Sequence, residues 1–144
     1  ILADFFVPSY ISCQSALNYY SIIPDVPFAV TSVTTFKTSN IKVKNYGSFI
    51  YYKIQPKLFF GYRIIKPSPL YFYKIAIPEK ALFDFIYLQS LKKDFDAENY
   101  LSEARFDFKK NFNWRKLKRW QELVPKNKKK LHLVLKNLFK RYKI

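Results

Sequence analysis

The chain has 144 residues, of which 49% are hydrophobic and 20% aromatic, and its formal net charge is +16. This composition supplies enough apolar surface for one folded domain over residues 1–144, and it argues against disorder over most of the chain. No apolar run reaches the roughly 18 residues of a membrane-spanning helix, and no signal peptide is visible. Because Cys13 is the only cysteine, an internal disulfide is excluded, and a reducing cytoplasm is the expected compartment.

Positive charge is concentrated in the last third of the chain. Residues 1–90 carry a net charge of +5 and residues 91–144 a net charge of +11. From Arg105 onward there are 15 basic and two acidic residues. This excess suggests a polyanionic partner, and a solvated lysine-rich surface is the alternative. The sequence also starts at Ile1 as if inside a longer one, so we expect a further N-terminal part.

A helix and then a strand are expected first. Residues 1–11 have an extended pattern and lead into a helix whose expected N-cap is Ser12. The helix should end before Pro24, and residues 26–36 then alternate as a strand. The side chains expected to face inward from the helix are Ala16, Leu17 and Tyr20.

The strand over residues 26–36 has two notable features. Alternation places Val26, Phe28 and Val30 on one face. A run of hydroxyl side chains lies within the same strand. Hydroxyl groups bond phosphate oxygens well, and they also line ordinary edge strands, so both interpretations are open. The run consists of Thr31, Ser32, Thr34 and Thr35.

A hairpin is predicted over residues 41–54, with Asn45-Tyr46-Gly47 supplying the left-handed positions of its turn. Lys42 and Lys44 share one face, opposite two aliphatic side chains, which indicates a half-buried hairpin with lysines outward. In the alternative interpretation the hairpin is a basic ribbon that lies on a DNA backbone. The aliphatic side chains are Ile41 and Val43.

A second strand pair is predicted after a short helical turn at residues 55–60. Residues 61–65 and 70–76 have the pattern of paired strands, joined by a turn over 66–69. Pro67 and Pro69 are expected to block strand continuation there, because proline has no backbone donor.

The most informative stretch is residues 77–88, which predicts an enclosed helix. Pro78 suits the first helical position, and Glu79 places a negative charge where the helix dipole favours it. Lys80 and Asp84 are four residues apart, so their side chains can meet. The first interpretation is a structural ion pair in the core. In the second, Lys80 or Glu79 is kept for a partner.

The last third predicts three helices. Asp96 should cap a helix over residues 97–105, and Asn113 one over residues 114–123. The last helix starts at residues 125–127 and has an apolar stripe opposite a basic face. Packing on the domain is expected, and membrane-surface binding is the weaker alternative. The stripe contains Leu131, Val134, Leu135, Leu138, Phe139 and Tyr142, and the basic face Lys128, Lys129, Lys136, Lys140 and Lys143.

These elements together predict an α+β fold, with an N-terminal helix and a mainly antiparallel sheet followed by a helical C-terminal half. Residues 1–90 are the mixed part and 91–144 the basic helical part. Aromatic side chains interleave with cations in the helical part, an arrangement that binds nucleic acid by charge and stacking, although core packing explains the aromatics equally. The candidate nucleic-acid-binding residues are Lys37, Lys42, Lys44, Arg115, Lys118, Arg119, Lys126, Lys128, Lys129 and Lys130.

No catalytic or metal site is predicted. His132 and Cys13 are too few to build a zinc site or a nucleophile pair, and two glycines are too few for a phosphate-cradling loop. Glu79 and Asp84 do not share a helix face. We therefore expect no cofactor and no enzyme activity, with a small nuclease as the enzymatic alternative.

Several separated blocks match a known family in order. Over residues 3 to 90 the chain resembles the AbiEi family, which comprises antitoxins and transcriptional autoregulators of bacterial type IV toxin–antitoxin systems. The motif positions are Thr31, Ser32, Thr34, Thr35, Pro78, Glu79, Lys80 and Asp84. The other blocks are Pro8 to Ser12, Ser15 to Leu17, Ile22 to Pro24, Lys37-Thr38 and Leu58 to Tyr62.

The resemblance implies an antitoxin domain that neutralises a nucleotidyltransferase-type toxin without a stable complex. It also implies operator DNA binding and autorepression. In the family an N-terminal winged helix-turn-helix reads the operator, and this chain matches the domain that follows it. A threonine often precedes the Pro-Glu-Lys motif in the family, whereas Ile77 occupies that position here, so an N-cap bond is expected to be missing. The alternative function is a general nucleic-acid-binding module that acts through its basic C-terminal helices.

Overall fold

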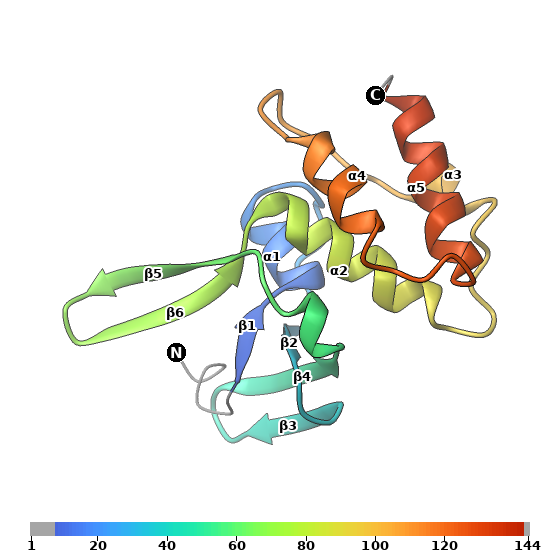
Figure 1. Ribbon diagram of the computed structural model, residues 1–144. Helices are drawn as coiled ribbons and strands as arrows, with labels where there is room; N and C mark the ends of the chain where they lie inside the picture. The colour runs from blue at the N-terminus through green and yellow to red at the C-terminus, as the bar shows by residue number, and fades with distance from the viewer. Residues whose placement is uncertain (1–7, 143–144) are drawn as a thin grey trace.

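The computed structural model describes residues 8–142 and has an α+β fold (Figure 1). Six strands form one sheet, and five α-helices follow or interrupt them within the described residues. The strands are β1 (Ser9–Ile11), β2 (Ala29–Thr34), β3 (Ser39–Val43), β4 (Gly47–Lys53), β5 (Tyr62–Ser68) and β6 (Tyr71–Ala76). The helices are α1 (Cys13–Tyr19), α2 (Pro78–Ser90), α3 (Tyr100–Glu103), α4 (Trp114–Gln121) and α5 (Lys129–Arg141).

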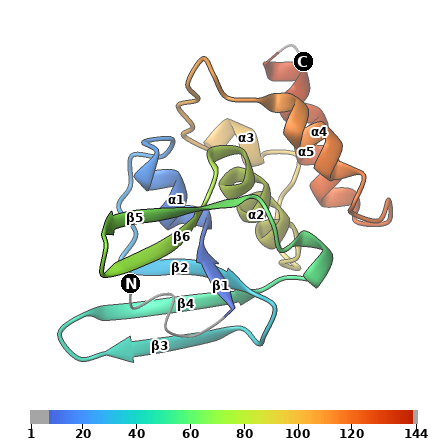
Figure 2. The same cartoon turned by 60° about the vertical axis from the view of Figure 1, so that its left-hand side comes forward.

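The sheet is mixed, with strand order β3-β4-β2-β1-β6-β5. Neighbours β1–β2, β3–β4 and β5–β6 are antiparallel, whereas β2–β4 and β1–β6 are parallel. A single residue pair, Ile11 with Ile75, joins β1 to β6. The β5–β6 hairpin is therefore attached to the sheet at one end only, and its far end extends away from α4 and α5 in both views (Figures 1 and 2).

The first hairpin forms where the sequence predicts it. The backbone is left-handed at Asn45 and Gly47, with φ of 70° and 92°, as the turn between β3 and β4 requires. Lys42 and Lys44 are exposed. On the opposite face the aliphatic side chains Ile41 and Val43 pack against Phe49 and Tyr51. The short helical turn expected after this hairpin is the 3-10 helix at Pro56–Leu58.

Several expected boundaries are wrong. The strand predicted over residues 26–36 is limited to β2, and Phe28 before it is 88% exposed. Strand β5 continues through Pro67, where the turn was expected, because a register shift between Ile65 and Ser68 accommodates the proline on an edge strand. The part of the expected extended segment before residue 8 lies outside the described residues. Lys143, expected on the basic face of the last helix, also lies outside them.

The helical half also differs in detail from the prediction. The expected helix over residues 97–105 is the four-residue α3, and its N-cap is Asn99. Asp96 instead accepts bonds from the backbone and side-chain nitrogens of Asn99, at 3.3 and 2.8 Å, and so stabilises the preceding turn. Asn113 does cap α4, because its Oδ1 accepts from the Arg115 backbone nitrogen at 3.1 Å. Helix α5 starts at Lys129, slightly later than expected.

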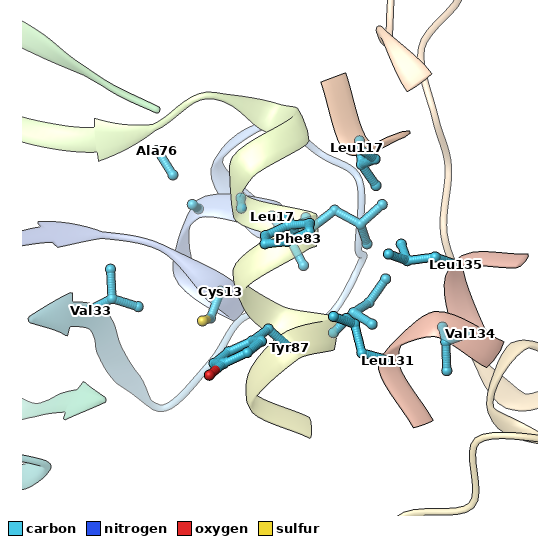
Figure 3. Close-up of a cluster of buried hydrophobic side chains, with 14 of the residues drawn as sticks. Cys13, Leu17, Val33, Ala76, Phe83, Tyr87, Leu117, Leu131, Val134 and Leu135 are labelled. Atoms are coloured by element: carbon cyan, nitrogen blue, oxygen red, sulfur yellow. The ribbon is translucent and has the colours of Figure 1, made fainter. Parts of the chain in front are cut away.

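Helix α2 is the centre of the core (Figure 3). Leu17 of α1 lies on one side of it, and Leu117 of α4 and Leu135 of α5 lie on the other. One continuous cluster of buried side chains includes these residues and Val33 of β2. Because α2 is covered from both sides, charged residues within it are forced into the interior. No helix within residues 8–142 has the length and apolar character needed to cross a membrane.

Candidate functional site

Lys80 is completely buried at the start of α2. Its ammonium donates to Asp84 Oδ1 at 2.6 Å, to the Leu58 carbonyl at 2.6 Å and to Tyr10 Oη at 2.8 Å. An ammonium group has three donors, so this set of acceptors satisfies all of them. The ring centre of Phe60 lies 4.6 Å from the same nitrogen, which adds a cation–π contact.

Asp84 completes the network from the other side. Its Oδ2 accepts from Tyr10 Oη at 2.9 Å and from Ser12 Oγ at 2.7 Å. Ser12 occupies the N-cap position of α1, as expected, but its side chain makes no capping bond. The serine hydroxyl is used for Asp84 instead, and the four side chains form a closed buried network.

The backbone around Gly61 is shaped to fit Lys80. Gly61 has φ of +77°, and a Cβ added there would lie 2.8 Å from Lys80 Cγ. A side chain at this position would therefore meet both backbone strain and the lysine stem. The blocks around Tyr10, Leu58 and Lys80, far apart in the sequence, each contribute to this single network.

Burial determines the ionisation behaviour of the network. Desolvation raises the pKa of Asp84 above its ordinary value, although Lys80 and the hydroxyls of Ser12 and Tyr10 oppose that shift. Burial and the nearby Asp84 carboxylate raise the pKa of Tyr10 well above its ordinary value. Every polar atom of the network has a partner in the fold, so we interpret the Lys80–Asp84 pair as structural.

The hydroxyl run of β2 is likewise engaged inside the fold. Thr31 Oγ1 donates to the Ser12 carbonyl at 2.6 Å and accepts from the Ser15 backbone nitrogen at 3.0 Å. Thr34 Oγ1 donates to the Pro8 carbonyl at 2.7 Å. Thr31, Ser32 and Thr34 are buried, and Thr35 is half-buried. These bonds fasten β2 to the chain around β1 and α1, so the hydroxyls of Thr31 and Thr34 are engaged inside the fold rather than turned to a phosphate ligand.

Glu79 faces the helical half rather than the network. Its Oε2 accepts from the Asn113 backbone nitrogen at 3.1 Å, and its Oε1 lies 3.9 Å from Lys116 Nζ. Glu79 thus joins the start of α2 to the start of α4. It also lines a pocket of about 520 Å³ whose charged rim includes Arg63, Lys109 and Lys116. Helix α2 has no side-chain cap at Ile77, as the missing threonine predicts.

The ten candidate nucleic-acid-binding residues fall into two separate groups. Lys37, Lys42 and Lys44 lie at or near β3, at one edge of the sheet, and all three are exposed. The others lie on α4, on α5 and in the loop between these helices. Helix α2 and the rest of the sheet separate the two groups in both views (Figures 1 and 2). The group on α4 and α5 consists of Arg115, Lys118, Arg119, Lys126, Lys128, Lys129 and Lys130.

Lys130 is not an available surface cation like its neighbours. Its ammonium donates to the Lys92 carbonyl at 3.3 Å and to the Lys93 carbonyl at 2.9 Å, so it anchors α5 to the segment just after α2. Lys126, Lys128 and Lys129 are exposed. We therefore remove Lys130 from the candidate nucleic-acid-binding set and keep the other three.

His132 and the tryptophans serve packing. The ring of His132 bonds the Gln121 side chain at 2.9 Å and the Pro125 carbonyl at 3.1 Å, joining α5 to the end of α4. Trp120 packs edge-on against Phe83, and Trp114 stacks on Tyr142 with ring centres 4.9 Å apart. These aromatics belong to the structure of the helical half.

The net charge summed over residues 1–90 hides a second charge asymmetry, which lies within those residues. Between Asp25 and Glu79 there is no acidic residue, whereas the same segment contains eight lysines and arginines. This segment includes β2 to β6, so these five strands carry basic side chains and no acidic ones. The sequence contains this acid-free stretch, but the net charge of residues 1–90 also counts the acidic residues before and after it.

Within residues 8–142, no group of three or more His, Cys, Asp or Glu side chains is placed to hold a metal ion. No protein-family model, no curated protein and no solved structure matches the chain. The relation to the AbiEi family therefore stays a prediction from the sequence blocks.

Proposed function

We propose that this chain is the antitoxin domain of an AbiEi-like type IV toxin–antitoxin system. In this proposal it opposes a nucleotidyltransferase-type toxin in the cytoplasm without forming a stable complex with it. It also helps to hold operator DNA through phosphate contacts. Recognition of the operator sequence belongs to the N-terminal part that the resemblance implies.

The observation that carries this proposal is the convergence of the resembling blocks. Tyr10 and Ser12 come from the first block, Leu58 from a middle block, and Lys80 and Asp84 from the last. Residues up to 74 positions apart share hydrogen bonds in one buried network. Blocks that meet in this way behave as the signature of one fold, which supports reading them together rather than as chance matches.

The phosphate-binding role is supported by the exposed cations of α4, of α5 and of the sheet edge near β3. Lysine and arginine side chains release condensed counterions when they meet phosphates, so affinity should fall as salt rises. Six such contacts would give a slope of log K against log salt of about −5. Duplex DNA of random sequence should bind with this slope and with little sequence preference.

Toxin rescue is the experiment that tests the antitoxin proposal. The chain is co-expressed with the toxin of its own operon, and growth is compared with an empty vector. Restored growth, with no stable complex recovered on co-purification, is the expected result. Growth arrest despite folded, abundant protein would contradict the proposal.

A general nucleic-acid-binding module is the second candidate, favoured by the same exposed cations. Changing Lys126, Lys128 and Lys129 to glutamate separates the two functions. If the chain is only a binding module, DNA affinity is its sole activity, and the parent chain gives no rescue. If it is an antitoxin, the parent chain rescues growth, and the variant reports whether rescue needs these cations.

A further inference from the structure

The β5–β6 hairpin has one packed face and one open face. Residues that pair across antiparallel strands lie on the same face, and the faces alternate along each strand. Arg63 pairs with Ile75, which is buried, and its guanidinium lies 5.5 Å from the ring centre of Tyr20 next to α1. The face that carries Arg63 and Ile75 is therefore turned toward the body of the domain.

The opposite face is largely apolar and is open to solvent toward the tip of the hairpin, whereas Ala76 at its other end is buried. Ile64, which pairs with Lys74, is 54% exposed, and Phe72 on the adjacent strand is 50% exposed. Tyr62 lies further along the same face with 37% of its surface exposed, and its other side stacks on Tyr10. The ring of Tyr62 thus stacks on Tyr10 of the core and also has the ammonium of Lys74 over it, so only part of the ring faces solvent.

Cations accompany these rings. Lys74 Nζ lies 5.7 Å from the ring centre of Tyr62, and Lys66 is exposed near the tip of the hairpin. The hairpin lies within residues 26–78, which include no acidic residue. The hairpin itself thus offers exposed apolar groups and positive charge without a carboxylate of its own, which suits a partner with flat apolar groups and negative charge.

We propose that the open face of the β5–β6 hairpin binds single-stranded nucleic acid, with a base stacking on the exposed ring of Phe72 and phosphates meeting Lys66 near the tip. Bases in a duplex are already stacked on one another, whereas unpaired bases present their faces to aromatic side chains. This surface is separate from the phosphate-binding residues of α4 and α5. The inference goes beyond the proposed function and does not depend on it.

The test compares oligonucleotide binding by the full chain and by matched variants. Fluorescently labelled single-stranded DNA, single-stranded RNA and duplex DNA of equal length are titrated by anisotropy at several salt concentrations. Phe72→Ala should weaken single-strand binding about tenfold, the loss expected for one stacking contact, and should leave duplex binding unchanged. Phe28→Ala, which removes an exposed ring outside the hairpin, is the matched control and should bind as the parent does.

Two further variants keep the test decisive if Phe72→Ala fails to fold. Phe72→Tyr keeps a stacking ring and should retain binding, whereas Lys66→Glu at the exposed tip should weaken it and reduce the salt slope. The tighter of the DNA and RNA arms identifies the sugar. Equal losses for Phe72→Ala and Phe28→Ala, or no single-strand binding at low salt, would overturn the proposal. Competition by polyglutamate as strong as by the oligonucleotide would also overturn it, since that result indicates an acidic protein partner.

Discussion

The lysines of this protein occupy two contrasting environments, one buried and one exposed. Lys80 is enclosed at the start of α2, with an acceptor for each of its three donors. Lys126, Lys128 and Lys129 lie exposed before and at the start of α5, in a region of the chain that has 15 basic and two acidic residues from Arg105 onward. The first environment belongs to the motif that the sequence makes conspicuous, and the second has no motif at all.

The difference teaches that a conspicuous charged motif can be a folding device. Removing one partner from a buried ion pair leaves an uncompensated charge in the interior and strongly destabilises the fold. The stability of the fold is therefore a sufficient reason for both residues to be present. Exposed lysines have no such constraint, and their number and placement matter more than any one position. We therefore interpret the buried network as part of the fold and propose the exposed cations as the surface that meets a partner.

The largest predicted effect comes from breaking the buried pair. Lys80→Ala leaves the Asp84 carboxylate buried and unpaired, so the free energy of unfolding should fall by about 3–5 kcal/mol. Urea unfolding followed by circular dichroism measures the loss. Lys57→Ala, which removes an exposed lysine of the 3-10 helix, is the control and should change stability little. A Lys80→Ala variant as stable as the parent would contradict the structural role.

The next effect concerns the close approach of the backbone to Lys80. Gly61→Ala and Gly47→Ala both place a side chain at positive φ, which costs about 1–2 kcal/mol. Only at Gly61 would the new Cβ meet a neighbour, because nothing lies within 4 Å of the position at Gly47. Gly61→Ala should therefore be the more destabilised by about 1–3 kcal/mol, the usual cost of overpacking. Equal unfolding free energies for the two variants would show that the Lys80 stem yields easily.

A third prediction addresses the exposed cations. Changing Lys126, Lys128 and Lys129 to glutamate should weaken duplex DNA binding and reduce the slope of log K against log salt by about 2.7, if all three meet phosphates. Thermal stability should stay near that of the parent. The same charge change at Lys57, Lys66 and Lys110, which are exposed and lie outside the start of α5, is the control for net charge. An equal loss of affinity in both triple variants would mean that total charge, rather than this surface, determines binding.

The smallest predicted change in stability near neutral pH comes from two buried groups, the thiol of Cys13 and the phenol of Tyr10. Burial raises the pKa values of Cys13 and Tyr10 well above their ordinary values. The unfolded chain loses these protons first, so it binds fewer protons than the folded chain above about pH 8.5. Stability from this source is fully present below that pH and should fall progressively as pH rises further.

Unfolding free energies measured from about pH 7 to pH 10 check this direction. Cys13→Ala removes the step nearest neutral pH and should flatten the first part of the decline. In the native chain the thiol should also react slowly with a thiol reagent until urea unfolds the protein. Rising stability over the same range would contradict the assignment.

The sequence alone predicts the local features well. The hairpin of β3 and β4, the Asn113 cap, the apolar stripe of α5 and the contact between Lys80 and Asp84 all follow from short-range patterns. Each involves residues that are neighbours along the chain or on one helix face, where spacing determines contact.

Long-range partners could not be predicted in the same way. Tyr10 and Ser12 reach Asp84 across 74 and 72 positions, and no periodicity within one element indicates such a pairing. The hydroxyls of Thr31 and Thr34 likewise bond backbone carbonyls that lie 19 and 26 positions away, and the sequence leaves their role open. The course of β5 through Pro67 depends on its position at a sheet edge, which only the tertiary structure determines.

The most direct test of the account is the DNA affinity of Lys80→Met, measured at a temperature where circular dichroism shows the variant to be folded. The account assigns Lys80 to the fold and DNA binding to exposed cations. It therefore predicts lowered stability with the affinity and salt slope of the parent chain. Parental stability combined with lost DNA binding would contradict it, because Lys80 would then act on the partner rather than on the fold.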